Sequence, residues 1–400
     1  MKETFFIQVP PGLEELAQLE FQLKFPGLYP SLPTPATLIE KGGLTVDLPL
    51  SAGCSLNYWL KIPNRILLRF AHFRCRDIPK LYNKVLKLNW SPYFAGQEYK
   101  IHTSSSESRL FDSRKIEQAI DDGLQGSLKR SEPKKKAKHR VGMNKSWHIF
   151  CRFDEDWCTL SIDTSGERLG KRGYKSKSGI APIRENIAAA LFLMTSNHQN
   201  SLPVGGDLLS SLTLIDPFCG SGTMILESLL FFEPNLYRNF AFEFFPLLET
   251  KEKLHFERPS KLNLDLPTFV IAADSDQGQT HSFQENLREA GLDSSEVLLL
   301  NENSMTDSFA QRVKNQVINK ETTTWCLTNP PYGKRVATNL SMRSILEKMS
   351  SWGEIEKIGI VLPKGQVIPK VPGIYFQKKI DFQNGGEDVS FYLYNGIKET

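Results

Sequence analysis

The chain has 400 residues, of which 40% are hydrophobic and 24% charged, and its formal net charge is +4 at pH 7. These values are typical of a soluble globular protein with two or three domains, and the charge is too small to indicate a partner by itself. No apolar run approaches the length of a membrane span and the N-terminus lacks a signal-peptide pattern, so we expect a cytoplasmic protein. The six cysteines form no C-x-x-C pair and the seven histidines are scattered, so we expect reduced thiols and no metal site.

The first part of the chain alternates short apolar strands with helical patterns, which is typical of small α+β units. Strands are predicted at residues 5–9, 43–48, 65–70, 99–103, 147–153 and 157–162. Helices are predicted at residues 13–23, 56–60, 77–88 and 112–124, the last with Asp112 or Ser113 as its N-cap. The acidic residues 154–156 predict a turn that joins the last two strands into a hairpin.

Two basic clusters lie between residues 129 and 177. Residues 129–145 hold eight Lys or Arg and one acid, Glu132, and a second cluster begins at Arg168. The first run is either a solvated loop or a surface that contacts phosphates, and the run alone favours neither interpretation. The residues predicted to contact nucleic acid are Lys134, Lys135, Lys136, Lys138, Arg140, Lys171 and Arg172.

Residues 212–227 predict a strand, a glycine-rich turn and a helix, the arrangement that binds nucleotides in doubly wound α/β sheets. The apolar run 212–215 ends at Asp216, and Gly220-Ser221-Gly222 allows a tight turn before the helix opens at Thr223. The turn lacks the third glycine of a dinucleotide site and the lysine of a P-loop. It resembles motif I of class I S-adenosylmethionine (SAM) methyltransferases, in which Asp216 would attract the positive charges of SAM.

The next two predicted strands supply further candidates for this cofactor site. Asp274 ends the strand 268–273 and is predicted to accept hydrogen bonds from the ribose hydroxyls, whereas Asp276 is predicted to cap the helix 279–290. The strand 297–300 leads to Asn303, where members of this class usually have an aspartate for the adenine. The predicted cofactor residues are Asp216, Pro217, Phe218, Gly220, Ser221, Gly222, Thr223, Asp274, Ser275, Asn303, Ser304 and Asn329.

A second motif, Asn329-Pro330-Pro331-Tyr332, follows the strand-like run 324–328 and resembles motif IV of the amino-methyltransferases. An exocyclic amine is a poor nucleophile, because its lone pair is delocalised into the ring. The Asn329 side chain and the Pro330 carbonyl supply two acceptors that hold both N–H groups, and Tyr332 can stack on an extruded base. The four residues are therefore the catalytic candidates, and the alternative is that they form only a Pro-rich turn.

A resemblance to one family extends over nearly the whole chain. Residues 160–174 and 181–188 are similar to the linker of THUMP-domain RNA guanine-N2 methyltransferases, most closely to the RlmL-like group that modifies 23S ribosomal RNA. The resemblance implies a class I SAM-methyltransferase domain with a doubly wound sheet at 212–400. It also implies a ferredoxin-like unit at 1–50, an RNA-binding THUMP domain at 51–163 and a helical linker at 164–211.

The function that this resemblance implies is SAM-dependent methylation of guanine N2 in 23S ribosomal RNA by a monomer. Two alternatives stay open at this stage. The substrate could be transfer RNA, an adenine or a glutamine amide, or the chain could be an RNA-binding assembly factor with a decayed methyltransferase domain. Asp216, Gly220, Gly222, Asp274 and Asn329 are all present, which argues against decay.

Overall fold

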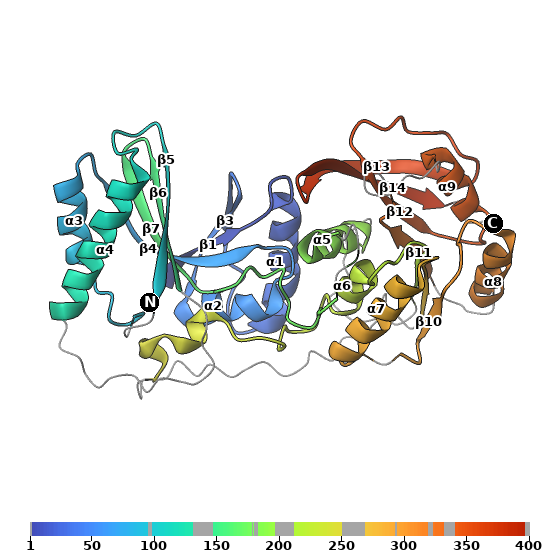
Figure 1. The fold of residues 1–400 in the computed structure, drawn as a ribbon, viewed down its shortest axis with the longest axis horizontal. Helices are drawn as coiled ribbons and strands as arrows, with labels where there is room; N and C mark the ends of the chain where they lie inside the picture. Colours follow the sequence, from blue (N-terminus) through green and yellow to red (C-terminus); the bar gives the residue numbers. More distant parts are fainter. Residues whose placement is uncertain are drawn as a thin grey trace.

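The computed structural model describes residues 2–94, 98–130, 147–177, 179, 183–196, 212–249, 269–292, 294–318, 323–331 and 341–396. Within these ranges the molecule is elongated and holds two seven-stranded sheets, one toward each end (Figure 1). Both sheets are mixed and carry helices, so the predicted α/β class is confirmed. Among the described helices, none combines the length and apolar character needed to cross a bilayer.

The first sheet is built from the N-terminal strands in the order β2-β3-β1-β4-β7-β6-β5. Its strands are β1 (Lys2–Gln8), β2 (Thr37–Glu40), β3 (Gly43–Pro49), β4 (Arg65–Arg74), β5 (Tyr99–Ser106), β6 (Trp147–Asp154) and β7 (Trp157–Asp163). The helices are α1 (Glu14–Leu28), α2 (Leu50–Trp59), α3 (Ile78–Leu86) and α4 (Ser113–Arg130). All neighbouring strands are antiparallel except the pair β5 and β6.

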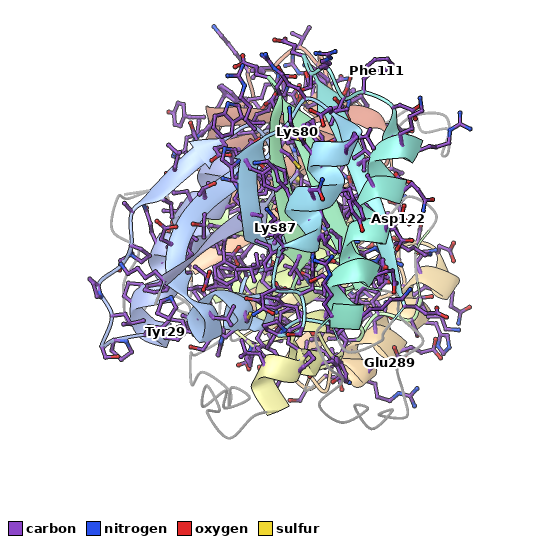
Figure 2. All side chains as sticks on the ribbon, turned by 90° about the vertical axis from the view of Figure 1, so that its left-hand side faces the viewer. Tyr29, Lys80, Lys87, Phe111, Asp122 and Glu289 are labelled. Carbon is purple, nitrogen blue, oxygen red and sulfur yellow. The ribbon has the colours of Figure 1, made fainter. Side chains whose placement is uncertain are left out.

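The helices of this half cover one face of the sheet, because the buried side chains of its strands share that face. A single row of cross-strand partners runs through Val46, Phe5, Leu68, Ile162 and Ile149. All five are at most 1% exposed and belong to the same hydrophobic cluster as residues of the four helices. Figure 2 views the molecule from the end where α3 and α4 cover the strands.

Most predicted elements of this half are present with shifted ends. Asp77 caps α3 through a hydrogen bond from the Lys80 amide, and the predicted hairpin turn places Glu155 and Asp156 at positive φ. Helix α2 begins at Leu50, six residues before the predicted start. The prediction missed the first residues because eight of the ten helix residues are buried, so the sequence shows no polar face. Strand β2 was not predicted, because this edge strand of only four residues is too short to show an alternating pattern.

The second sheet has the order β10-β9-β8-β11-β12-β14-β13. Its strands are β8 (Leu212–Asp216), β9 (Phe269–Ala273), β10 (Val297–Leu300), β11 (Thr323–Thr328), β12 (Lys357–Pro363), β13 (Ile374–Asn384) and β14 (Glu387–Gly396). The first five strands are parallel, and the β13–β14 hairpin adds antiparallel strands beside β12. The helices are α6 (Thr223–Leu229), α7 (Gln277–Glu289), α8 (Asp307–Ile318) and α9 (Met342–Ser350), with short 3₁₀ helices η2 (Ala241–Phe244) and η3 (Pro246–Glu249).

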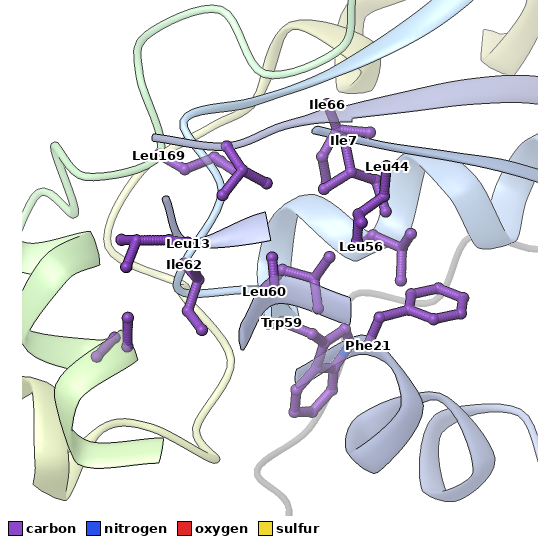
Figure 3. Packing of buried hydrophobic residues seen from close by; sticks show 14 of the residues in the cluster. Ile7, Leu13, Phe21, Leu44, Leu56, Trp59, Leu60, Ile62, Ile66 and Leu169 are labelled. Carbon is purple, nitrogen blue, oxygen red and sulfur yellow. The ribbon is translucent and has the colours of Figure 1, made fainter. Parts of the chain in front are cut away.

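The two halves are joined by helix α5 (Glu185–Ser196) and by a continuous hydrophobic cluster. Residues 186–195 of α5 are all buried, and the helix packs against α6 as well as α1, as its place in Figure 1 indicates. Figure 3 shows the neighbouring part of the cluster, where Leu169, which follows the first sheet, lies with Leu13 and Ile62.

A buried polar contact also crosses between the halves. The Lys24 ammonium of α1 donates to Glu20 Oε1 at 2.6 Å and to the Phe231 carbonyl, beyond α6, at 2.7 Å. Glu20 accepts from the Lys61 and Ile62 amides, so both ions are paired although they are buried. Because buried charges are tolerated only with such partners, these contacts hold the halves in one arrangement.

Candidate functional site

The candidate site lies where the strand order of the second sheet reverses, at the carboxyl ends of β8 and β11. Strands on either side of this point run from β8 through β9 in one direction and from β11 through β12 in the other. Asp216 ends β8 and Asn329 follows β11, so the two predicted motifs meet at the edge where doubly wound sheets bind their ligands.

A hydrogen bond joins the two motifs directly. Thr328 Oγ1 donates to Asp216 Oδ1 at 2.7 Å, and the Phe218 amide donates to the same oxygen at 3.2 Å. Thr328 is fully buried and Asp216 is only 2% exposed. Burial raises the pKa of Asp216 to about 7, against the lowering effects of these two hydrogen bonds. A positively charged ligand beside this buried carboxyl group would stabilise its ionised form, which burial disfavours.

The glycine-rich turn has the predicted left-handed conformation. Gly220 has φ of 53° and Gly222 has φ of 84°. A Cβ atom at Gly222 would lie 2.0 Å from the ring of Phe283, so this glycine also lets α7 pack against the turn. The Thr223 hydroxyl, at the start of α6, accepts a hydrogen bond from Lys175 Nζ at 2.7 Å.

Asp274 holds the same turn from the second strand. Its two carboxylate oxygens accept from the Gly220 amide and from the Asp276 amide, each at 2.9 Å. Burial raises the pKa of Asp274. Its ribose contact therefore stays a prediction that requires the remaining lone pairs of the carboxylate. Asp276 caps α7 by accepting from the Gly278 amide at 2.7 Å, and Ser275 between them is exposed.

The loop after β10 carries the two remaining cofactor candidates. The Asn303 side-chain oxygen accepts from the Met305 amide at 3.0 Å, so this exposed residue stabilises its own turn. Ser304 is 2% exposed, and its hydroxyl has no hydrogen-bond partner among the described residues. The Ser304 hydroxyl is thus a buried polar group suited to a ligand.

The second motif begins at the end of β11, with Asn329 and Pro331 half-buried and Pro330 buried. Tyr332 lies outside the described residues. The structure therefore sets the position of the two predicted acceptors, Asn329 and Pro330, next to Thr328 and hence next to Asp216. Their catalytic role stays a prediction.

Sequence reasoning missed Asn286, which is fully buried on α7. Its side-chain amide donates to the Ser221 carbonyl at 3.0 Å and to the Lys177 carbonyl at 3.1 Å, and so ties the turn to the segment that precedes α5. An asparagine three residues after Phe283, on the apolar face of α7, was the available signal. The role of Thr328 had no comparable signal, because nothing in the sequence shows which strand ends are neighbours.

The predicted nucleic-acid contacts have different outcomes. Lys134, Lys135, Lys136, Lys138 and Arg140 lie outside the described residues, and Lys171 is exposed beside Glu167.

Arg172 does not fit the prediction, because it is 3% exposed and its guanidinium is fully engaged. It donates to Glu227 at 2.8 Å and to the Lys61 carbonyl at 2.7 Å, and Tyr174 also donates to Glu227. Arg172 therefore belongs to the buried contact between the halves and is not a surface contact for RNA.

Cys219 lies in the turn but is not suited to attack a substrate. It is 6% exposed, and burial raises the pKa of its thiol, with further increases from Asp216 and Asp274. A thiol rather than a thiolate is therefore expected at neutral pH. Within the described ranges, no group of three or more His, Cys, Asp or Glu side chains is placed to hold a metal ion.

The two halves of the chain match the models of two different domains. A family model described as RMKL-like, methyltransferase domain, matches residues 172–355, and the THUMP domain model matches residues 75–163. Residues 75–163 thus match a THUMP domain and residues 172–355 an RMKL-like methyltransferase domain, the two domains that the sequence resemblance implied. S-adenosylmethionine is the cofactor of this methyltransferase domain, which confirms the prediction from motif I.

Individual proteins agree with this assignment. A Bacillus subtilis protein named "Putative RNA methyltransferase YpsC" is 26% identical over 87% of this chain and 84% of its own length. Ribosomal RNA large subunit methyltransferase K/L of Marinobacter nauticus is 27% identical over 90% of this chain but only 47% of its own length. This chain thus spans about half the length of that relative. The crystal structure of SMU.472 with SAH has a TM-score of 0.72 at 21% identity and covers 100% of this chain and 99% of that one.

The described residues fit the cofactor. Asp216 offers a buried acid to a cation, the turn at Gly220 and Gly222 presents backbone without side chains, and Ser304 offers a buried hydroxyl. These groups follow the carboxyl ends of β8 and β10, two parallel strands that flank β9 in the same sheet. In the described part of the chain, the hydrogen-bond partners of the Asp216 carboxylate are the Phe218 amide and the Thr328 hydroxyl, both neutral groups, so no basic side chain among them competes with a cationic ligand.

Proposed function

We propose that this protein is a cytoplasmic methyltransferase that places one methyl group on the exocyclic N2 amine of a guanine in RNA, with 23S ribosomal RNA as the substrate. The observation that carries the proposal is the hydrogen bond from Thr328 to Asp216. It brings the start of the Asn-Pro-Pro-Tyr sequence to the acid of the cofactor motif, which is the arrangement that methylation of an amine requires.

The proposed chemistry is transfer by position rather than by a strong base. SAM supplies a methyl group that is activated by its bond to a positively charged sulfur. Asn329 accepts one N–H of the amine with its side-chain oxygen, and the Pro330 carbonyl accepts the other. The nitrogen lone pair is thereby aimed at the methyl carbon, and most of the rate gain comes from orientation. Methylation makes the amine more acidic, so its proton passes to water without a dedicated base.

The remaining residues of the site act on cofactor and RNA binding in this proposal. Asp216 attracts the positive charge of the cofactor, and Asp274 and Asn286 keep the glycine-rich turn in place from two sides. Asp274 also accepts from the ribose. Tyr332 stacks on the extruded guanine once it leaves its helix.

The choice of RNA rests on the N-terminal half. A THUMP domain occupies residues 75–163, and the basic run 129–145 lies in its second half. The relatives named for the large ribosomal subunit support ribosomal RNA over transfer RNA. The four-part division with boundaries after residues 50, 163 and 211 and the monomeric state remain part of this proposal. One sheet runs from β2 to β5 across the first of these boundaries.

The test is a methylation assay with purified protein, SAM, and either 23S ribosomal RNA or transfer RNA, followed by mass spectrometry of the nucleosides. We expect N2-methylguanosine from the ribosomal RNA, and none from the Asn329→Ala variant. N6-methyladenosine, or methylation of transfer RNA alone, would contradict the proposed substrate. SAM binding by calorimetry without transfer to any RNA would instead support a non-catalytic assembly factor.

A further inference from the structure

The first sheet has a second face that the proposed chemistry does not use. The four helices of its half pack on one face, whereas strands β4 to β7 present exposed side chains on the other. In Figure 1, α3 and α4 lie on one side of β5, β6 and β7. Trp157 of β7 is 44% exposed on the opposite side, and its strand neighbour Cys158 is fully buried beneath the helices.

Two stacked ring pairs lie on this exposed side. The rings of Trp157 and His72 are parallel within 4° at 4.8 Å, and the rings of Phe150 and His102 lie at 4.8 Å and 18°. The register confirms the common face, because Phe150 pairs with His102 on β5 and with Ser161 on β7. We call His72, His102, Phe150, Arg152 and Trp157 the stacking face.

We propose that the stacking face binds unpaired nucleotides of the RNA substrate, with a base stacked on Trp157. This inference rests on the proposed function, which identifies the ligand as RNA. It adds the surface that binds the RNA and the requirement that the bound nucleotides are unpaired. Flat rings on an open sheet stack on bases of any identity, because every base has a π-face. Bases inside a duplex cannot reach such rings, so the face selects loops and single strands.

The charges on the face agree with stacking as its main contribution. Arg152 is paired with Asp154 at 2.8 Å, Arg69 with Glu40 at 2.7 Å, and Arg65 with Asp163. Arg65 lies over the Phe150 ring, 5.6 Å from its centroid. These arginines add positive charge to the face but release few counterions when a phosphate binds, since each already has a carboxylate.

The histidines add ring area rather than charge. His148 Nδ1 lies 2.8 Å from His102 Nε2, and burial lowers the pKa of His148 to about 4 and also lowers the pKa of His102. Both rings are therefore neutral at pH 7, and the face keeps the same character through the physiological pH range.

The experiment measures fluorescence anisotropy of a labelled single-stranded RNA of about ten nucleotides, and of the same sequence as a duplex, with the full-length protein. We expect the wild type to prefer the single strand. Trp157→Ala should weaken its binding about tenfold, and Trp157→Phe, which keeps a ring, should retain most of the affinity. Tyr375→Ala removes an aromatic ring that is 64% exposed on the second sheet, and it is the matched control that should change nothing.

Several results would overturn the inference. These are no binding of the single strand, equal binding of strand and duplex, unchanged affinity in Trp157→Ala, or an equal loss in Tyr375→Ala. Circular dichroism of each variant checks that the sheet is intact, and Trp157→Phe keeps the test valid if an alanine variant unfolds. SAM titration and methyl transfer are measured separately. A protein that binds the strand through Trp157 but methylates no RNA refutes the proposed function and leaves this surface assigned.

Discussion

The ionisation of Asp216 gives the sharpest prediction, because the structure sets both its sign and its size. Burial raises its pKa to about 7, whereas the ordinary value is 3.8. Between these values the folded protein keeps a proton that the unfolded chain has lost. The stability that this neutral carboxyl contributes is therefore fully present below pH 3.8 and is lost as the pH rises to about 7. At about 1.36 kcal/mol per pKa unit, the loss from this group approaches about 4 kcal/mol.

A bound cation reverses this cost. SAM carries positive charge and favours the ionised carboxylate, so its affinity should increase with pH up to about 7 and then level off. Calorimetric titration of wild type between pH 5.5 and pH 8.5, about one unit and a half on each side of that value, measures this dependence and the protons released on binding. Asp216→Asn should bind SAM more weakly at pH 8, with an affinity that no longer depends on pH in this range.

Asp216→Asn has a second consequence in the protein without cofactor. The asparagine side chain can still accept from Thr328 and Phe218, so the local hydrogen bonds can remain. Without the buried acid, urea unfolding at pH 8 should show a variant that is more stable than wild type, and the difference should vanish near pH 4. A wild-type SAM affinity that is flat from pH 5.5 to pH 8.5, together with a variant of equal affinity, would refute the assignment of Asp216 as the cation partner.

Four other sets of variants test the remaining catalytic, structural and RNA-binding assignments. Asn329→Ala should keep SAM and RNA binding but lower kcat, because the activation free energy should rise by about 2.7–4 kcal/mol, by analogy with loss of one oxyanion-hole donor. A wild-type single-turnover rate would mean that another group holds the amine. Thr328→Val should lower kcat and SAM affinity together, whereas Thr328→Ser keeps the hydroxyl and should behave like wild type; equal kinetics for the two would show that the bond to Asp216 is dispensable. Glu227→Gln leaves Arg172 buried without its carboxylate and should cost about 3–5 kcal/mol in urea unfolding, with Glu233→Gln as a half-buried control of small effect. Replacing Lys134, Lys135, Lys136 and Lys138 by Ala should make RNA affinity depend less steeply on salt concentration, because fewer counterions are released on binding. An unchanged salt dependence would mean that the basic run is a solvated loop.

Much of the candidate site followed from local sequence. Positive φ at Gly220 and Gly222, the cap at Asp276 and the strand ending in Asp216 depend on residues within a few positions of one another. The turn between β13 and β14 is also encoded locally, because Gly385 and Gly386, which follow Asn384, both have positive φ. Such features are encoded locally because steric limits on φ and side-chain capping act over one turn of chain.

The sequence by itself therefore determined the two motifs, most strands and helices, the family and the cofactor. It could not give the contacts between segments that lie far apart along the chain. The Thr328–Asp216 bond spans 112 residues, and the Arg172–Glu227 pair spans 55. Charge alone made Arg172 a surface candidate, but tertiary packing buried it against Glu227, because a guanidinium can be removed from water only where a carboxylate and carbonyls replace its hydration. The open face of β4 to β7 likewise depends on strand register, which decides on which side Trp157 and Phe150 lie.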